Sequence, residues 1–244
     1  MRYTRYFFVV IALVLGFGAH LYAADEAQKV VVNTNIVSGT QRIYDVVLTV
    51  KGATETVLTM KIRHRYIDRS DDGVMLMEAS LEHGTLRSGG QELFVSPSIY
   101  PKLTIMLDPG YHIKDIFGSI STGEQSNASC INYSNMIVLF YLPDGDKWHT
   151  VGESWESSVS LPTAGETFNI VNTLKGVETV GAENIAVVDQ KISRVSAHSS
   201  AVSVESRFRC GDGKLLESHV LCAVPDVVDS KSISQVTMDI TQSK

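Results

Sequence analysis

The chain has 244 residues, of which 44% are hydrophobic and 20% are charged, and it contains only three Cys. This composition excludes a fully disordered chain, a collagen-like fibre, a small disulfide-rich scaffold and a polytopic membrane protein. Its 21 Lys and Arg against 27 Asp and Glu give a formal net charge of −6. Nucleic acid and anionic membrane surfaces bind clustered Lys and Arg, so the balance predicts no nucleic-acid partner.

Residues 1–24 have the pattern of a signal peptide. Two arginines precede an apolar run of 13 residues, 7–19, and the small residues Ala23 and Ala24 follow. The run fits an export leader and is shorter than the roughly 20 apolar residues of a membrane span. We expect cleavage near Ala23 or Ala24, a periplasmic or extracellular location, and no stable membrane span in the mature chain. The alternative is a leader retained as an anchor. Cleavage leaves 19 basic against 27 acidic residues, a formal net charge of −8.

After residue 30 the hydrophobic pattern repeats every two residues, which is typical of half-buried antiparallel strands. In 42–51, for example, Tyr44, Val46 and Leu48 share one side. In 61–65, Lys61, Arg63 and Arg65 alternate with Ile62 and His64, which predicts a solvated basic face on one strand. The predicted strands are 42–51, 57–67, 73–82, 91–95, 102–107, 111–117, 154–161, 166–174, 183–193, 201–209, 214–222 and 232–240.

Gly and Pro mark the turns between these strands, because tight reversals need a positive or a preset φ. Turn sequences occur at 71–73, 108–110, 143–145 and 211–213. The turns at 108–110 and 211–213 are each flanked by two predicted strands. They therefore predict two β-hairpins.

The chain is predicted to be all-β, with two similar antiparallel β units in one compact body. The units cover residues 25–118 and 154–244 and form curved sheets of the sandwich or half-barrel type. A loop-rich connection, 119–153, joins them, and its Ser-, Gly- and Asn-rich part, 118–135, is expected at the surface. The similar strand order has two explanations, an ancient duplication or the ordinary strand spacing of all-β proteins.

The three cysteines are Cys130, Cys210 and Cys222. If a hairpin turns at 211–213, Cys222 lies opposite the region of Ser203, too far from Cys210 for a bridge. The sequence predicts at most one disulfide, from Cys130 to Cys210 or Cys222, and equally allows three free thiols.

Residues able to do chemistry are scattered. His149, beside Trp148 in a predicted loop, is the most site-like histidine, although Trp148 is expected to cover a sheet end. His64 is expected to be a core or rim residue because it lies on an apolar strand face. The carboxylate pairs Asp71-Asp72 and Glu153 with Glu156 could serve acid–base catalysis only within a cleft.

The sequence lacks the spaced ligands and loops of the common catalytic and binding motifs. It has no His-Glu-x-x-His, no Cys-x-x-Cys and no phosphate-binding Gly loop that opens a helix. Gly152-Glu153-Ser154-Trp155-Glu156 begins like a nucleophile elbow but ends in Glu and precedes a strand. No catalytic residue, metal site or cofactor is predicted, and ligand-binding residues are not identified.

Several short motifs resemble a family of uncharacterised exported bacterial β-proteins, some of them lipoproteins. The resemblance covers about half of the chain, is strongest from Leu139 onward and is weaker around Leu107-Asp108-Pro109-Gly110. In such proteins a Gly-acidic-x-Trp step opens the second β unit and a Gly-x-Leu turn lies in its closing hairpin. No catalytic or ligand residues are established for the family, so the resemblance implies none here. The motifs are Leu142-Pro143-Asp144, Val151-Gly152-Glu153-Ser154-Trp155-Glu156, Asn172-Thr173-Leu174-Lys175-Gly176-Val177-Glu178 and Gly211-Asp212-Gly213-Lys214-Leu215-Leu216-Glu217-Ser218.

Physically, the same residues have structural roles. Trp155 is expected to cap a core at the start of a strand, and Gly152, Gly176 and Gly213 are expected to permit turns.

Together these features predict an exported cell-envelope protein that is a non-enzymatic binding or structural module. Its possible partners are an apolar ligand or another envelope protein. The alternative is a hydrolase whose site assembles only in the fold, around the central loop and His149. A third possibility is an oligomeric or surface interaction module, for which an edge strand such as 232–240 would serve. The oligomeric state itself is not predicted.

Overall fold

The computed structural model describes residues 28–32, 35–52, 54–97, 102–110, 112–118, 136–161, 166–195, 202–225 and 233–243. The predicted leader, most of the segment 118–135 and Cys130 lie outside these ranges. The described residues form β strands and one short 3₁₀ helix, η2 (Ile137–Phe140). The strands are β1 (Lys29–Val30), β2 (Gln41–Lys51), β3 (Thr56–Arg69), β4 (Met75–Ser88), β5 (Gln91–Val95), β6 (Leu103–Leu107), β7 (Ile113–Phe117), β8 (His149–Thr150), β9 (Ser154–Leu161), β10 (Glu166–Val180), β11 (Glu183–Arg194), β12 (Val202–Arg209), β13 (Leu215–Pro225) and β14 (Ile233–Gln242).

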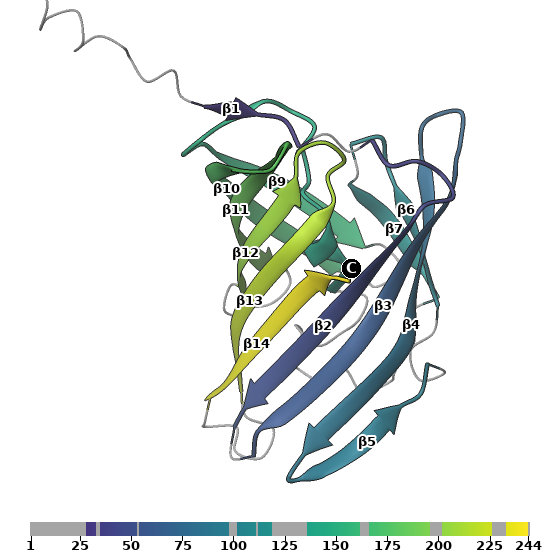
Figure 1. Cartoon of the computed structure of the whole chain (residues 1–244), viewed down its shortest axis with the longest axis vertical. Coiled ribbons are helices and arrows are strands. Elements are labelled where there is room, and N and C mark those ends of the chain that lie inside the picture. The colour runs from purple at the N-terminus through teal and green to yellow at the C-terminus, as the bar shows by residue number, and fades with distance from the viewer. Residues whose placement is uncertain are drawn as a thin grey trace, which may run out of the picture.

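Most strands belong to one antiparallel sheet that curls until its two ends meet (Figure 1). Its order is β7-β6-β4-β3-β2-β14-β13-β12-β11-β10-β9, and β5 is added beside part of β4. The end strands β7 and β9 are in contact but do not form a ladder with each other. We call this boundary the seam. The prediction of an all-β protein with curved antiparallel sheets of the sandwich or half-barrel type is confirmed. The strands of both predicted units belong to one sheet, which is nearly closed.

The inner face of the sheet holds the core because strand side chains alternate between the two faces. In β2, Tyr44, Val46 and Leu48 are buried. In β3, Ile62 and His64 point inward, while Lys61 and Arg63 lie on the outer face and form ion pairs with Asp45 and Glu82. The basic stretch of β3 is therefore a solvated strand face, as its alternation predicted.

All twelve predicted strands are present, with boundaries that differ by a few residues. The largest differences are in β4 and β10, which each continue six residues past the predicted end, to Ser88 and Val180. Gly176 of β10 does not turn the chain. It lies at a register shift between β10 and β11, and the reversal comes at Gly181, where φ is 63°. Gly152 and Gly213 do have positive φ, as their predicted turns require.

The C-terminal strand β14 occupies the middle of the sheet. The prediction that 232–240 is an edge strand is wrong. One side of β14 pairs with β13, where Ile240 faces Ser218, and the other side pairs with β2, where Ile240 faces Val46. An alternating pattern shows that a strand has one buried face but does not show whether its edges are paired. The strands before and after the connection thus share one sheet, and β14 joins them.

The end of the connection passes through the interior of the sheet. All seven residues of Met136–Leu142, which we call the plug, are buried. The Phe140 ring lies 4.9 Å from the Tyr44 ring and 4.6 Å from the His64 ring, on the inner faces of β2 and β3. This run of seven apolar residues was the sequence feature that could have indicated an interior segment, because apolar side chains in a loop seek burial.

The β12–β13 hairpin keeps Cys210 and Cys222 apart. Ser203 faces Leu221, so Cys222 lies near Ser203 in register, and the two cysteines are not joined to each other. The predicted bridge through Cys130 lies outside the described residues. Within the described ranges, no helix has the length and apolar character needed to cross a membrane.

Candidate functional site

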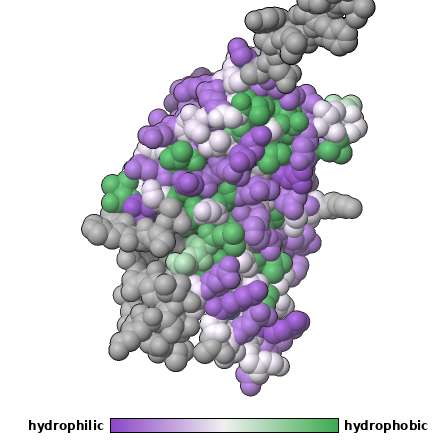
Figure 2. All heavy atoms as spheres, turned by 90° about the vertical axis from the view of Figure 1, so that its left-hand side faces the viewer, coloured by the Kyte–Doolittle hydropathy of each residue, from purple (hydrophilic) through white to green (hydrophobic). Residues whose placement is uncertain are grey.

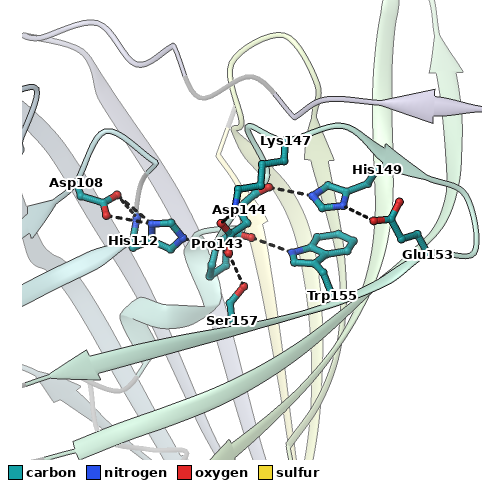
Figure 3. A network of polar contacts seen from close by, with 9 residues as sticks. All are labelled: Asp108, His112, Pro143, Asp144, Lys147, His149, Glu153, Trp155 and Ser157. Atoms are coloured by element: carbon teal, nitrogen blue, oxygen red, sulfur yellow. Dashed lines mark hydrogen bonds and ion pairs between the residues drawn. The ribbon is translucent and has the colours of Figure 1, made fainter.

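Nine residues form a polar network at the end of the sheet where the turn between β6 and β7, the segment after the plug and β9 come together (Figure 3). We call it the rim network. Strand β1 pairs with β8 close by, where Val30 faces His149. The members are Asp108, His112, Pro143, Asp144, Lys147, His149, Glu153, Trp155 and Ser157.

His112 lies between two carboxylates. Its Nδ1 is 3.0 Å from Oδ2 of Asp108, and its Nε2 is 3.3 Å from Oδ2 of Asp144. The backbone N–H of His112 also donates to Asp108, at 2.9 Å, which fixes the turn before β7. When protonated, the imidazole donates to both carboxylates. His112 thus links the β6–β7 turn, on one side of the seam, to the segment after the plug.

Asp144 connects that segment to β9, on the other side of the seam. Its carboxylate accepts hydrogen bonds from Lys147 and, at 3.0 Å, from Ser157 Oγ. Burial alone would raise the pKa of Asp144, but hydrogen bonds from Lys147, Ser157 and His112 outweigh it and hold the pKa below its usual value. The backbone of Asp144 has φ of 58°, a left-handed conformation that Asp adopts more readily than most residues.

His149 and Trp155 form the second half of the rim network. Their rings stack with centroids 3.7 Å apart and an interplanar angle of 14°. His149 Nε2 donates to the carbonyl oxygen of Asp144 at 2.9 Å, and Trp155 Nε1 donates to the carbonyl oxygen of Pro143 at 3.1 Å. Glu153 accepts the backbone N–H of Thr150, which is the main reason that its pKa is lowered. These contacts fasten the end of the plug to the start of β9.

The structure brings only some of the sequence-predicted candidate residues together. His149 and Glu153 come together, with His149 Nδ1 3.4 Å from Glu153 Oε1. Trp148 does not cover a sheet end, because 70% of its surface is exposed, and Trp155 provides the cover instead. Asp71 and Asp72 lie exposed in the turn between β3 and β4, and Glu156 is exposed on β9.

Five members of the rim network were not predicted as polar partners: Asp108, His112, Asp144, Lys147 and Ser157. The sequence indicated 108–110 and 143–145 only as turns. The turn sequences fix local backbone shape, whereas the side-chain contacts depend on how the two ends of the sheet approach each other.

A second polar group lies inside the sheet. Arg42 donates to the carbonyl oxygen of Asp212 at 2.9 Å, and its guanidinium lies 5.3 Å from the centre of the Tyr66 ring, a cation–π contact. Tyr141 of the plug lies 3.3 Å from the Tyr66 hydroxyl and 3.5 Å from His64 Nδ1. Burial, with a smaller effect of Arg42, lowers the pKa of His64 to about 3. His64 is therefore a neutral core histidine, as its position on an apolar strand face predicted.

A buried polar row crosses β10 to β13 on the opposite wall. Gln190 donates to Asn172 at 2.9 Å, and Ser206 hydrogen-bonds Gln190 at 3.4 Å and Ser218 at 3.0 Å. Within the described residues, Asn172 Nδ2 and His64 Nε2 have no hydrogen-bond partner, and both atoms are closed off from solvent. Because neither atom is accessible, these interior polar groups are core contacts and do not form an open ligand site.

The polar groups of the rim network are engaged with one another. The Ser157 hydroxyl donates its hydrogen bond to Asp144 and not to His112. It therefore lacks the histidine base of a nucleophilic pair. Asp108 and Asp144 face opposite nitrogens of His112 and do not converge on one point. In the described part of the chain, no three His, Cys, Asp or Glu side chains gather so as to hold a metal ion. The contacts of the rim network fasten the two ends of the sheet to the segment after the plug.

The outer face seen from the side of β9 to β13 carries hydrophobic side chains in separate groups among hydrophilic ones (Figure 2). Val171 and Leu221, among the exposed hydrophobic residues of these strands, have 36% and 40% of their surface exposed. This face resembles an ordinary solvated sheet surface.

Neither protein-family models nor curated proteins include a match to the sequence. Among solved structures, a Bacteroides fragilis protein described as a candidate exported protein with a YmcC-like fold aligns over 88% of this chain and 100% of its own. The sequence identity is 8% and the TM-score is 0.29. Similarity at this level assigns neither fold nor function.

Proposed function

We propose that the protein is an exported module of the cell envelope that works without catalysis and acts through its outer surface. The observation that carries the proposal is the plug. Its seven side chains are buried against the inner face of the sheet, where an apolar ligand would otherwise be carried. An outer-surface contact with another envelope component therefore fits the geometry better than transport of a ligand inside the sheet.

The rim network adds support for a structural role. A catalytic histidine needs a free nitrogen that can reach a substrate or nucleophile, whereas both nitrogens of His112 face carboxylates. We therefore do not advance a hydrolase, since no contact in the rim network favours one. Export is proposed from the Arg-containing, apolar pattern of residues 1–24.

Cell fractionation followed by native mass spectrometry tests the proposal. The full-length chain is expressed with its own leader in its native host, and each fraction is examined. We expect the protein in the envelope fraction, with a mass that corresponds to cleavage near Ala23 or Ala24 and with no bound lipid. Full-length protein confined to the cytoplasm would contradict export, and a stoichiometric lipid would contradict the filled interior.

In-cell cross-linking from exposed and from buried positions tests the surface role. An outer-surface contact predicts that the wild-type chain is cross-linked to a defined envelope component from exposed positions. A matched label on the buried residue Ile137 should give no such product, because that side chain does not reach the surface. Cross-links confined to buried positions would overturn the proposed mode of action.

A further inference from the structure

The geometry points to the free edge of β5 as a surface on which a second copy of this chain docks by antiparallel strand pairing. This inference rests on the proposed function in one respect, because it names the outer surface through which a contact is made. Dimerisation is measured on purified protein. The chain can therefore prove monomeric although it is located in the envelope, or dimeric although it is not.

Strand β5 extends the sheet at the far end of β4, away from the main path (Figure 1). It follows a two-residue turn, Gly89-Gly90, in which both glycines have positive φ, 56° and 78°. In register, Ser88 faces Gln91 and Gly84 faces Val95. Strand β6 pairs with the other half of β4, so among the described strands only β4 pairs with β5.

Both faces of β5 meet solvent. Leu93 and Phe94 are consecutive and therefore point to opposite faces of the strand, yet 58% and 69% of their surfaces are exposed. Only Val95, at the end of the strand, packs against the core. The β4–β5 hairpin thus projects beyond the packed body and presents apolar side chains on both faces.

The usual protections of an edge strand are weak in β5. Natural edge strands commonly carry a proline, a bulge or charged side chains, of which lysine is the most frequent. The pairing of β5 with β4 has a continuous register, the strand contains no proline, and its single charge, Glu92, is paired with Arg87 at 2.7 Å. The exposed row of backbone groups is therefore open to another strand.

The two-residue turn determines which backbone groups face outward. Ser88 and Gln91 close the turn as a hydrogen-bonded pair, so the N–H and C=O groups of 91, 93 and 95 point toward β4. Those of Glu92 and Phe94 point to the free edge. A second copy related by a two-fold axis at Leu93 would hydrogen-bond Glu92 to the partner subunit's Phe94, and Phe94 to the partner subunit's Glu92.

Charge favours this register and a second copy as the occupant. A two-fold axis at Glu92 would place two carboxylates directly opposite each other, which is unfavourable. An axis at Leu93 places each Glu92 opposite a phenylalanine, lets each Glu92 keep its Arg87, and brings the two Leu93 side chains together. The short strand is self-complementary in this register, which is the requirement for a closed two-fold contact.

A pair of substitutions at Phe94 tests the register. Residue 94 would face the partner subunit's Glu92, and this pair occurs twice because of the two-fold symmetry. Phe94→Glu therefore places one carboxylate opposite another in each pair, whereas Phe94→Lys places a lysine opposite a carboxylate. The wild-type chain is purified from the cell fraction in which it is found. Light scattering and sedimentation over the micromolar range should then show reversible dimers. We expect Phe94→Glu to raise the dissociation constant at least about tenfold and Phe94→Lys to stay within about threefold of wild type.

The outcomes separate the register from a general apolar contact. A wild-type chain that remains monomeric over the whole range overturns the inference, and so does equal weakening by Phe94→Lys and Phe94→Glu. Hydrogen exchange on the wild-type chain gives a measurement that does not depend on variants folding. The amides of Glu92 and Phe94 should become more protected as concentration rises, and no concentration dependence at these amides overturns the inference.

Discussion

His112 connects the two sides of the seam through its two ring nitrogens. Its replacement by Ala leaves Asp108 and Asp144 without the group between them. We expect His112→Ala to lower the free energy of unfolding by about 1–2 kcal/mol, the scale of a partly exposed, charge-assisted hydrogen bond. Urea unfolding at neutral pH measures the change.

The matched control is His83→Ala. Because His83 is exposed on β4, this substitution should change the free energy of unfolding by less than about 0.5 kcal/mol. Equal effects of the two substitutions would contradict a role for His112 in closure.

The lowered pKa of Asp144 predicts a pH-dependent contribution to stability. A carboxyl group whose pKa is lower in the folded than in the unfolded chain stabilises the fold above its unfolded pKa of 3.8. It loses that contribution as the pH falls through the folded pKa. We expect Asp144→Asn to cost about 1–2 kcal/mol at neutral pH and almost nothing in strong acid. Asn also tolerates the left-handed backbone. Urea unfolding of both proteins across acidic pH tests this, and a difference that stays constant with pH would refute it.

At the scale of the residue, the sequence predicted environments better than partners. His64 was expected in a core or rim because its neighbours alternate, and that is a property of one strand. His112 contacts Asp144 only because the curvature of the whole sheet places β6 and β7 next to β9. No local pattern contains that information, so the contacts of the rim network could not be derived from the chain alone.

At the scale of the element, the plug is the segment whose removal should cost most. Phe140 is 1% exposed and contacts the rings of Tyr44 and His64. Phe140→Ala should lower the free energy of unfolding by about 3–5 kcal/mol, because it leaves a cavity among rigid neighbours. The control Trp148→Ala removes an aromatic side chain that is 70% exposed and should have an effect within about 0.5 kcal/mol. Thermal and urea unfolding measure both, and a small effect of Phe140→Ala would show that the plug is dispensable.

The strands were predicted closely because a half-buried antiparallel strand has its own period, as in β5 and β9, whose bounds match the prediction. The plug was not predicted, since a short apolar run without a period can be a strand, a buried turn or a loop. The length of β10 was underestimated because Gly176 produces a register shift inside the strand, and a bulge and a turn use similar residues.

At the scale of the whole molecule, β14 holds the sheet together. Deletion of residues 233–244 would remove the strand that pairs with both β13 and β2 and would expose two long edges. We expect the shortened chain to lose cooperative unfolding and to aggregate, whereas removal of Lys244 alone should leave the unfolding transition unchanged. Circular dichroism and size-exclusion chromatography compare the two. A folded, monomeric product after the longer deletion would show that the two sets of strands are stable apart.

The place of β14 also sets the order in which the chain can finish folding. Tyr44 near the start of β2 pairs with Gln242 near the end of the chain. While ribosomes synthesise the intervening segment, β2 has β3 on one side and no partner on the other. The ladder between β2 and β14 therefore forms only after the last strand of this sheet has been made, and its formation requires closure of a very long loop. For as long as that strand is missing, the unpaired edge of β2 is open to pairing with other chains, which makes this intermediate prone to aggregation.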